Sequence, residues 1–515
     1  VGFYSAFMVS DHITVVTRKY GSDTACRWES DGVDGYTVEP CEKETVGTDI
    51  ILHIKKDPED EPGEYSQYLQ EYALKSLVKK YSDYIRFPIR MEVTHSRRKE
   101  GSPDDKPEYE DVREWETLNS MVPIWQRKKA DVKPEEYNEF YREKFHDFAD
   151  PQRVITVSAE GAVTYKALLF IPGTTPFDFY TKEYEKGLQL YSSGVLIMDK
   201  CPDLLPEHFR FVRGVVDSPD LSLNISRELL QHDRQLKVIA GNLEKKIKSE
   251  LAKMLKDERE AYEEFFKAFG IQLKFGVYND YGMHKDALKD LLIFRSSAEK
   301  KYVTLKEYVS RMVEGQDTIY YACGETDEKI DMLPQADAVK DKGYEILYLT
   351  ENVDEFAVKM MGEYDGKKFV NICDENLNLD SEDEKKALNE ENEAAKDMFE
   401  AMKESIGDKV NAVRFTNKLK NHPVCLTSEG GISLEMEKVL NSMPGAEQNK
   451  VKAQLVLEIN ASHPIAEKLK KLYTDDKDTL SKYAKLLYGE ACLIGGKTVP
   501  DPAEHSALVC ELMTK

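Results

Sequence analysis

The sequence has 515 residues, of which 41% are hydrophobic and 32% are charged. At roughly 100 to 200 residues per domain, this length predicts three or four domains. Acidic residues number 95 against 72 basic ones, so the net charge is -23. This field repels phosphate backbones and argues against nucleic acid as a partner. The absence of a long uncharged apolar window argues against a membrane protein.

The eight cysteines are sparse and are never spaced CxxC, which is typical of reduced thiols rather than of a disulfide framework. No secretory signal opens the sequence, and an apolar run is already in progress at Val1. We therefore expect a cytoplasmic protein, and we expect this sequence to be a fragment of a longer one.

Residues 1–94 are expected to form an α/β domain. The apolar patterns predict strands near Ile13–Thr17 and Gly47–Ile54, followed by a helix from about Glu64. From Ile85 to Val93 apolar and polar residues alternate, which predicts a half-buried strand. Residues 95–112 are charged and contain two prolines, so we interpret them as an exposed linker.

Residues 113–378 are expected to form a two-part α/β domain. Arg153–Ala159 and Val163–Phe170 flank a glycine as a β-hairpin does, and a long helix is predicted from about Ile225. Residues 302–371 alternate strand-like and helical runs, as in a parallel sheet. The apolar stripe of the long helix consists of Leu236, Ile239, Leu243, Ile247 and Leu251.

Residues 383–515 are expected to form a mostly helical domain. Ser381–Lys403 is acidic and fits either disorder or a helix, and its Ala, Glu and Lys content without Pro or Gly favours the helix. An apolar stripe from Leu480 to Ala491 and a last helix from about Asp501 need a cover. A second copy of the chain would provide one in a homodimer, while packing onto their own domain is the alternative.

The familiar catalytic motifs are missing: the sequence has no HExxH, GxSxG, GxGxxG or complete P-loop, and we expect no metal site. Three weaker features remain. Gly2 precedes a helix, Gly47-Thr48 starts a strand, and Arg227 and Gln231 lie four residues apart on one helix face. Each could bind a nucleotide, but a feature of this kind taken alone is more often structural, Arg227 as the partner of a neighbouring acid.

Together these segments resemble the ninety-kilodalton heat-shock chaperones of the bacterial HtpG type. The segment from Val1 to Val9 resembles the end of their ATP-lid motif, and further matches run through most of the chain. The matching segments are Gly47-Thr48, Leu118-Asn119, Pro123 to Trp125, Glu135 to Tyr137, Lys166 to Pro172, Gly214 to Ser218 and Leu223 to Gln231. The ending Glu511 to Lys515 and the short linker resemble bacterial members.

The resemblance implies an α/β (α+β) multidomain chaperone: part of a GHKL-type ATPase sandwich, a middle domain and a C-terminal dimerisation domain. It implies ATP with magnesium as cofactor and nucleotide contacts from the lid end and one strand. It also implies that Arg227 reaches the γ-phosphate, with Gln231 beside it. The implied nucleotide contacts are Val1, Gly2, Phe3, Thr48 and Arg227. The family's catalytic glutamate and metal ligand precede the lid motif, so we expect an incomplete ATP pocket here.

The resemblance also implies that unfolded or non-native client proteins and a second copy of the chain are the partners. Trp125 and Phe148 lie in segments that resemble the family's client surface, while Met436 and Met443 lie on a predicted amphipathic helix. Each of these side chains could instead belong to a core. The main alternative function is a dimeric holdase fragment that works without nucleotide. A DNA-processing relative of the same ATPase superfamily fits poorly with the charge of -23.

Overall fold

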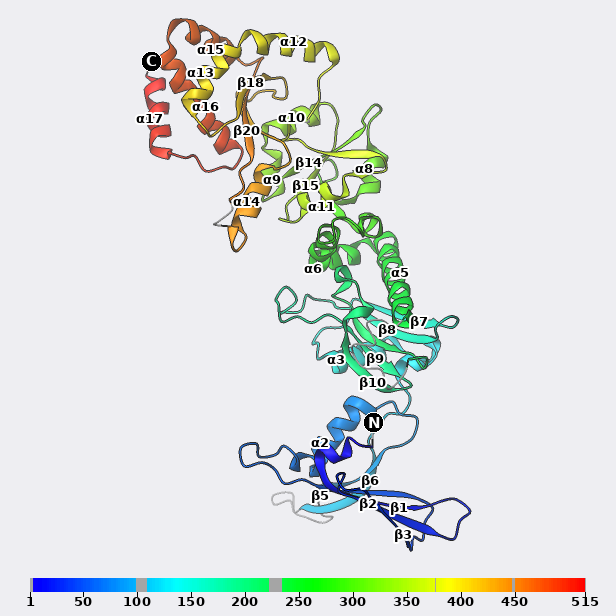
Figure 1. The fold of residues 1–515 in the computed structure, drawn as a ribbon. Helices are drawn as coiled ribbons and strands as arrows, with labels where there is room; N and C mark the ends of the chain where they lie inside the picture. Colours follow the sequence, from blue (N-terminus) through cyan, green and yellow to red (C-terminus); the bar gives the residue numbers. More distant parts are fainter. Residues whose placement is uncertain (1–2, 99–108, 222–233, 376, 447–449, 515) are drawn as a thin grey trace.

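The structure is a computed structural model that describes residues 3–98, 109–221, 234–375, 377–446 and 450–514. The chain forms an elongated row of sheets and helices, with the sheet of β1, β2 and β3 at one end and its last helix at the other (Figure 1). We call residues 3–118 the N-terminal unit, residues 119–375 the middle unit and residues 377–514 the C-terminal unit. The predicted mixed α/β multidomain fold is confirmed.

A four-stranded antiparallel sheet with the order β3-β2-β1-β4 opens the N-terminal unit. Its strands are β1 (Ser10–Arg18), β2 (Ala25–Ser30), β3 (Thr37–Cys41) and β4 (Gly47–Ile54), preceded by the short α1 (Ala6–Val9). The predicted strand Gly47–Ile54 is therefore confirmed, at one edge of the sheet. The predicted helix appears as α2 (Glu71–Leu77), which continues through a π-helical turn over Val78–Ser82.

The two predictions for residues 85–112 were wrong in their details. The strand begins at Arg90 rather than Ile85, because the preceding backbone is folded around the side chain of Asn119, whose amide binds the main chain at Ile85, Phe87 and Ile89. The supposed linker is strand in its described parts, since β5 (Arg90–Arg98) pairs with β6 (Tyr109–Thr117). Charged residues there pair across the strands while they stay exposed, as Arg97 does with Glu114 at 2.9 Å.

The middle unit begins with a five-stranded sheet of order β10-β9-β11-β8-β7, in which β9 and β11 are parallel. The strands are β7 (Arg153–Ala159), β8 (Tyr165–Ile171), β9 (Leu188–Ser192), β10 (Val195–Cys201) and β11 (Arg213–Asp217). β7 and β8 form the predicted hairpin. One face packs on α3 (Pro134–Phe145), and the other packs on α5 (Arg234–Asp257) and α6 (Arg259–Tyr278). Alternating residues of β8 therefore enter two different cores.

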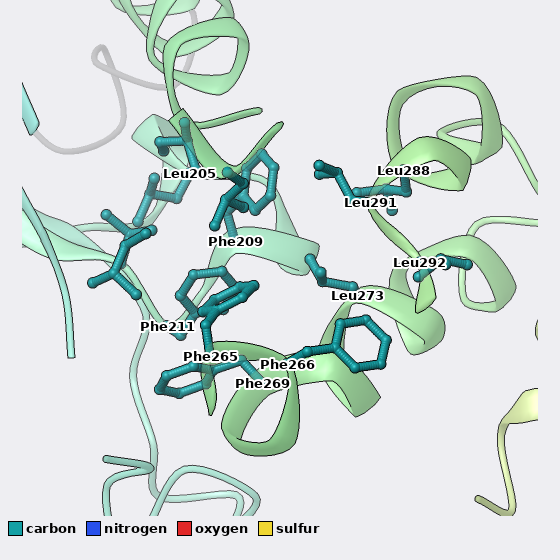
Figure 2. Close-up of a cluster of buried hydrophobic side chains, with 14 of the residues drawn as sticks. Leu205, Phe209, Phe211, Phe265, Phe266, Phe269, Leu273, Leu288, Leu291 and Leu292 are labelled. Carbon is teal, nitrogen blue, oxygen red and sulfur yellow. The ribbon is translucent and has the colours of Figure 1, made fainter. Parts of the chain in front are cut away.

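The larger core contains the predicted apolar stripe of α5, whose five side chains are all buried. Figure 2 shows its aromatic centre, where Phe209, Phe211 and Phe269 lie near Leu273 and Leu288. The rings of Phe211 and Phe269 stack with centroids 4.8 Å apart. This core joins the five-stranded sheet to the second part of the middle unit.

That second part is a six-stranded sheet of order β13-β12-β15-β14-β17-β16, and its parallel centre confirms the βαβ prediction. The strands are β12 (Ile293–Ser296), β13 (Tyr302–Thr304), β14 (Thr318–Cys323), β15 (Ile346–Leu349), β16 (Glu363–Tyr364) and β17 (Lys367–Asn371). The helices are α7 (Lys285–Leu288), α8 (Leu305–Arg311), α9 (Asp327–Asp331), α10 (Pro334–Asp341) and α11 (Asp354–Met361).

The C-terminal unit surrounds a three-stranded sheet of order β18-β20-β19, made of β18 (Ala412–Thr416), β19 (Val424–Glu429) and β20 (Gln454–Asn460). The helices are α12 (Glu382–Ala394), α13 (Lys396–Ile406), α14 (Leu434–Ser442), α15 (Pro464–Asp475), α16 (Lys477–Ile494) and α17 (Pro502–Met513). Helix α12 and most of α13 fall in Ser381–Lys403, so the helical interpretation of that segment is confirmed.

One part of the dimer argument was wrong. The stripe from Leu480 to Ala491 lies in the core of its own unit, against α13 and β19, so it does not need a partner. Helix α17 is different, because none of its residues is buried and it packs mainly on α16. Only the last helix therefore offers an uncovered apolar surface of the predicted kind.

Candidate functional site

The two described nucleotide-contact candidates lie on one face of the first sheet. Phe3 lies edge-on to Trp28, with ring centroids 5.6 Å apart, and the Thr48 hydroxyl lies 2.8 Å from that of Thr17. Trp28 and Thr48 both flank β1, opposite Val15 and Thr17, two residues that point to the same side of the strand. Val1 and Gly2 lie outside the described residues.

The described residues fit only part of an ATP site. Phe3 is 42% exposed and offers an aromatic edge, and Thr48 offers an exposed hydroxyl. Among the residues that the structure describes, no group of three or more His, Cys, Asp or Glu side chains is placed to hold a metal ion. The face could contact a nucleobase, and we derive no hydrolytic step from it.

The predicted catalytic pair, Arg227 and Gln231, lies outside the described residues. What the structure does show is how the preceding strand ends. Asp217, the last residue of β11, is buried and accepts hydrogen bonds from Trp125 Nε1 at 3.1 Å and Gln126 Nε2 at 2.9 Å. These hydrogen bonds fix the end of β11 to the 3-10 turn Ile124–Gln126.

Trp125 is not an exposed client contact. Its side chain is 5% exposed and packs between the rings of Tyr84 and Tyr191, with centroid distances of 4.6 and 5.2 Å. Its indole N–H donates to Asp217. A buried tryptophan with its N–H satisfied is a core residue, and it joins the end of the N-terminal unit to the middle unit.

Phe148, in contrast, is fully exposed, as a client contact must be. Sequence reasoning missed a second exposed ring, that of Phe177. Their two segments run side by side, because Gly173 packs on the main chain of Asp150 with no room for a side chain. The rings of Phe148 and Phe177 are therefore each exposed apolar surface that water does not favour. The signal was present in the sequence: Phe177 follows Pro176 in a segment without helical or strand periodicity.

Helix α14 carries the predicted methionine contacts, but they are unequally placed. Met443 is exposed at the C-terminal end of the helix. Met436 is half-buried and lines a cavity of about 70 Å³ with Phe356 and Val439. Burial raises the pKa of Glu435, which lines the same cavity. The helix thus presents one exposed methionine and one that faces the middle unit.

Sequence reasoning also missed the contact that fixes α14. The carboxylate of Glu355, at the start of α11, is buried and accepts hydrogen bonds from Ser433 Oγ, from Tyr321 Oη at 3.2 Å and from Asn371 Nδ2 at 3.0 Å. Ser433 is the N-cap of α14. A single buried acid therefore attaches the methionine helix to the middle unit.

All eight cysteines are free. Burial raises the pKa of the Cys373 thiol to about 12 and raises that of Cys425 as well. Thiols with raised pKa values stay protonated and are poor nucleophiles. These side chains therefore do not add a thiol-based activity to the site.

Comparison with known proteins identifies the family. The Hsp90 protein family model matches residues 102–515. The chaperone protein HtpG of Bacillus subtilis is 55% identical over 513 residues, which is 100% of this chain and 81% of that protein. HtpG proteins of Clostridium perfringens and Clostridium botulinum match with the same identity and coverage. The chain belongs to the Hsp90 family.

Family membership makes this chain a chaperone, as the sequence resemblance implied. None of the helices in the described ranges is long and apolar enough to cross a bilayer. The cytoplasmic location stays a prediction.

Proposed function

We propose that this protein is a dimeric chaperone that binds unfolded or non-native proteins in an ATP-dependent cycle of opening and closing. The observation that carries the proposal is the exposed aromatic surface of Phe148 and of Phe177 in an Hsp90-family chain. Non-native proteins expose apolar segments, which such a surface can shield from water. Met443 on α14 adds a second, flexible contact.

The nucleotide part of the proposal rests on the Phe3 and Thr48 face and on Arg227 and Gln231. ATP with magnesium would supply the free energy of phosphate-bond cleavage to the cycle. Phe3 and Thr48 would border the base, and Arg227 would meet the γ-phosphate, with Gln231 beside it. The charge of an arginine suits developing phosphoryl charge.

The domain roles follow the same proposal. Residues 1–94 would be the C-terminal part of the nucleotide domain, residues 113–378 the middle domain, and residues 383–515 the dimerisation domain. Because β5 pairs with β6, residues 95–98 and 109–112 lie in a strand pair between the proposed nucleotide and middle domains rather than in a flexible linker. A second copy of the chain would meet the uncovered surface of α17.

Suppression of client aggregation tests the proposal. We expect the chain to slow the aggregation of a chemically denatured globular protein, and we expect Phe148→Ser combined with Phe177→Ser to remove most of that effect. Phe87→Ser is the matched control, because Phe87 is also exposed but belongs to the N-terminal unit. Equal suppression by both variants would contradict the client surface.

Nucleotide dependence is tested in the same assay. We expect client release to respond to ATP only when a complete nucleotide site is present, since the described residues hold no magnesium site. A chain that suppresses aggregation and never responds to ATP, even after its N-terminal unit is exchanged for the complete nucleotide domain of the Bacillus subtilis relative, would favour the nucleotide-independent holdase.

A further inference from the structure

The last helix is seated on α16 through one close contact between Gly489 and His505. A Cβ atom built on Gly489 would lie 2.2 Å from His505 Nδ1 and 2.6 Å from His505 Cε1. Carbon and nitrogen atoms do not approach so closely, so only glycine leaves space for the imidazole at this point of α16. Glycine inside a helix costs roughly 0.5 to 1 kcal/mol relative to alanine. Glycine at position 489 therefore lowers the stability of α16, and the close approach of α17 explains why glycine is nevertheless present there.

His505 is the enclosed residue of this contact. Its side chain is 13% exposed, and its Nε2 lies 3.2 Å from Glu490 Oε1. Two ion pairs lie at the rim of this contact, Lys482 with Glu511 at 2.6 Å and Lys485 with Glu504 at 2.8 Å. Exposed ion pairs of this kind contribute little and tolerate movement. The angle of α17 thus depends mainly on the imidazole and the glycine.

Helix α17 turns to solvent the face that points away from α16. His505, Leu508 and Leu512 recur at helical spacing on the side toward α16, while Ala507 and Cys510 are exposed. None of the α17 residues is buried within the chain. In a homodimer with twofold symmetry, both copies of α17 contribute the same surface, so a change in its tilt alters the interface twice.

We propose that Gly489 and His505 are positioning residues of the dimer interface: the imidazole, seated on the bare backbone at Gly489, holds α17 at the angle at which a second copy of this chain can pair with it. The inference rests on the proposed homodimer. It does not require either side chain to touch the partner.

Dimer affinity in four forms of the full chain tests this inference. The forms are wild type, Gly489→Ala, His505→Ala and the double variant, each examined by sedimentation at a series of concentrations. We expect Gly489→Ala to weaken the dimer by about tenfold or more, because its methyl group displaces the imidazole and α17 with it. The double variant should dimerise more tightly than Gly489→Ala alone, since the clash is gone.

A purely structural role of Gly489 predicts a different pattern. Alanine is the better helix former, so with no seated imidazole Gly489→Ala would stabilise α16 and leave the dimer unchanged. The matched control is Gly241→Ala in α5, a helical glycine near which the described residues outside its own helix turn place no atom within 4 Å of the added carbon. This control should keep the dimer affinity of wild type.

The outcomes test two claims separately, the positioning role of Gly489 and His505 and the existence of the homodimer. Additive effects of Gly489→Ala and His505→Ala, or a dimer that Gly489→Ala leaves intact, would overturn the positioning role while the homodimer stands. A wild-type chain that stays monomeric at tens of micromolar would overturn the homodimer itself. If Gly489→Ala does not fold, a double variant that folds and dimerises supports the clash, and a double variant that also fails to fold overturns it.

Discussion

The buried carboxylate of Glu355 accepts a hydrogen bond from the hydroxyl of Ser433, which is also the N-cap of α14. The side chain of Ser433 therefore both caps the start of α14 and attaches this helix to the middle unit. Lys359 reinforces the contact by donating from Nζ to the carbonyl of Gly431 at 3.0 Å. The position of Met436 and Met443 is thus linked to α11, in the other unit.

Ser433→Ala should loosen α14 more than the loss of an ordinary helix cap. Removing a cap costs about 1 kcal/mol, and leaving the buried Glu355 carboxylate short of a donor adds about 1 to 3 kcal/mol. The matched control is Ser381→Ala, which removes the cap of α12 at an exposed position. Unfolding in denaturant and hydrogen exchange across residues 434–442 measure both. Equal losses in the two variants would contradict the attachment.

A second attachment of α14 should depend on pH. Glu325 binds Lys329 and Lys438, the latter at 2.9 Å, and these hydrogen bonds lower the pKa of Glu325 from its ordinary value of 4.5 to about 2. A carboxyl with a depressed pKa stabilises the folded state above its ordinary pKa, and this contribution is lost as the pH falls toward the folded value. Protection of α14 should therefore decrease below about pH 4.5.

Hydrogen exchange of α14 between about pH 6 and about pH 3 checks this effect. Glu325→Gln should lack the added protection throughout and show a flatter profile than wild type. Glu328→Gln is a control in α9, the short helix that follows Glu325, because the lowered pKa of Glu328 comes from hydrogen bonds to the backbone and to Thr326 rather than from α14. Parallel profiles for wild type and Glu325→Gln would contradict the assignment. The effect should be small, since Glu325 is 55% exposed.

Local periodicity predicted most elements well. The strand Gly47–Ile54, the hairpin at Arg153–Ala159 and the buried stripe of α5 all follow from spacing within one segment. For the hairpin and the stripe of α5 the pattern succeeds because burial of one face is decided by the segment itself, whereas Gly47–Ile54 forms its strand although it stays exposed over nearly its whole length. The strand that was expected at Ile85 failed for the opposite reason, since it is displaced by Asn119, about thirty residues later in the chain.

The site was harder to predict because exposure depends on distant partners. Trp125 and Phe148 look alike in the sequence, yet only Trp125 meets the rings of Tyr84 and Tyr191. The apolar stripe of α16 is covered by its own unit, which the helix pattern alone does not reveal. Glu355 looks like an ordinary surface acid at the start of a helix, and only the tertiary structure brings Ser433 and Asn371 to it.

Trp125→Ala should unfold the junction rather than weaken client binding directly. Truncating a buried aromatic side chain costs about 3 to 5 kcal/mol, and the Asp217 carboxylate would also lose one of its two donors. Trp125→Phe keeps much of the packing and should cost less. Unfolding in urea measures both. Suppression of client aggregation per folded molecule should stay at the wild-type value, and a specific loss of suppression with unchanged stability would restore Trp125 as a client contact.

Arg227→Ala should slow ATP hydrolysis by about a hundredfold or more if the guanidinium stabilises charge on the γ-phosphate. The affinity for ATP should change much less, because most binding contacts would come from the nucleotide domain. The measurement needs a complete nucleotide site, so it is made on a chimera in which the segment that precedes the aligned region of the Bacillus subtilis relative stands before Val1.

Arg234→Ala is the matched control, because Arg234 is an exposed arginine at the start of α5. If Arg227 is only the partner of a neighbouring acid on its helix, its removal costs a few tenths of a kcal/mol and leaves turnover unchanged. The two readouts separate these roles: a slow enzyme with an unchanged melting temperature supports the γ-phosphate contact. Equal turnover of wild type and Arg227→Ala would remove Arg227 from the mechanism.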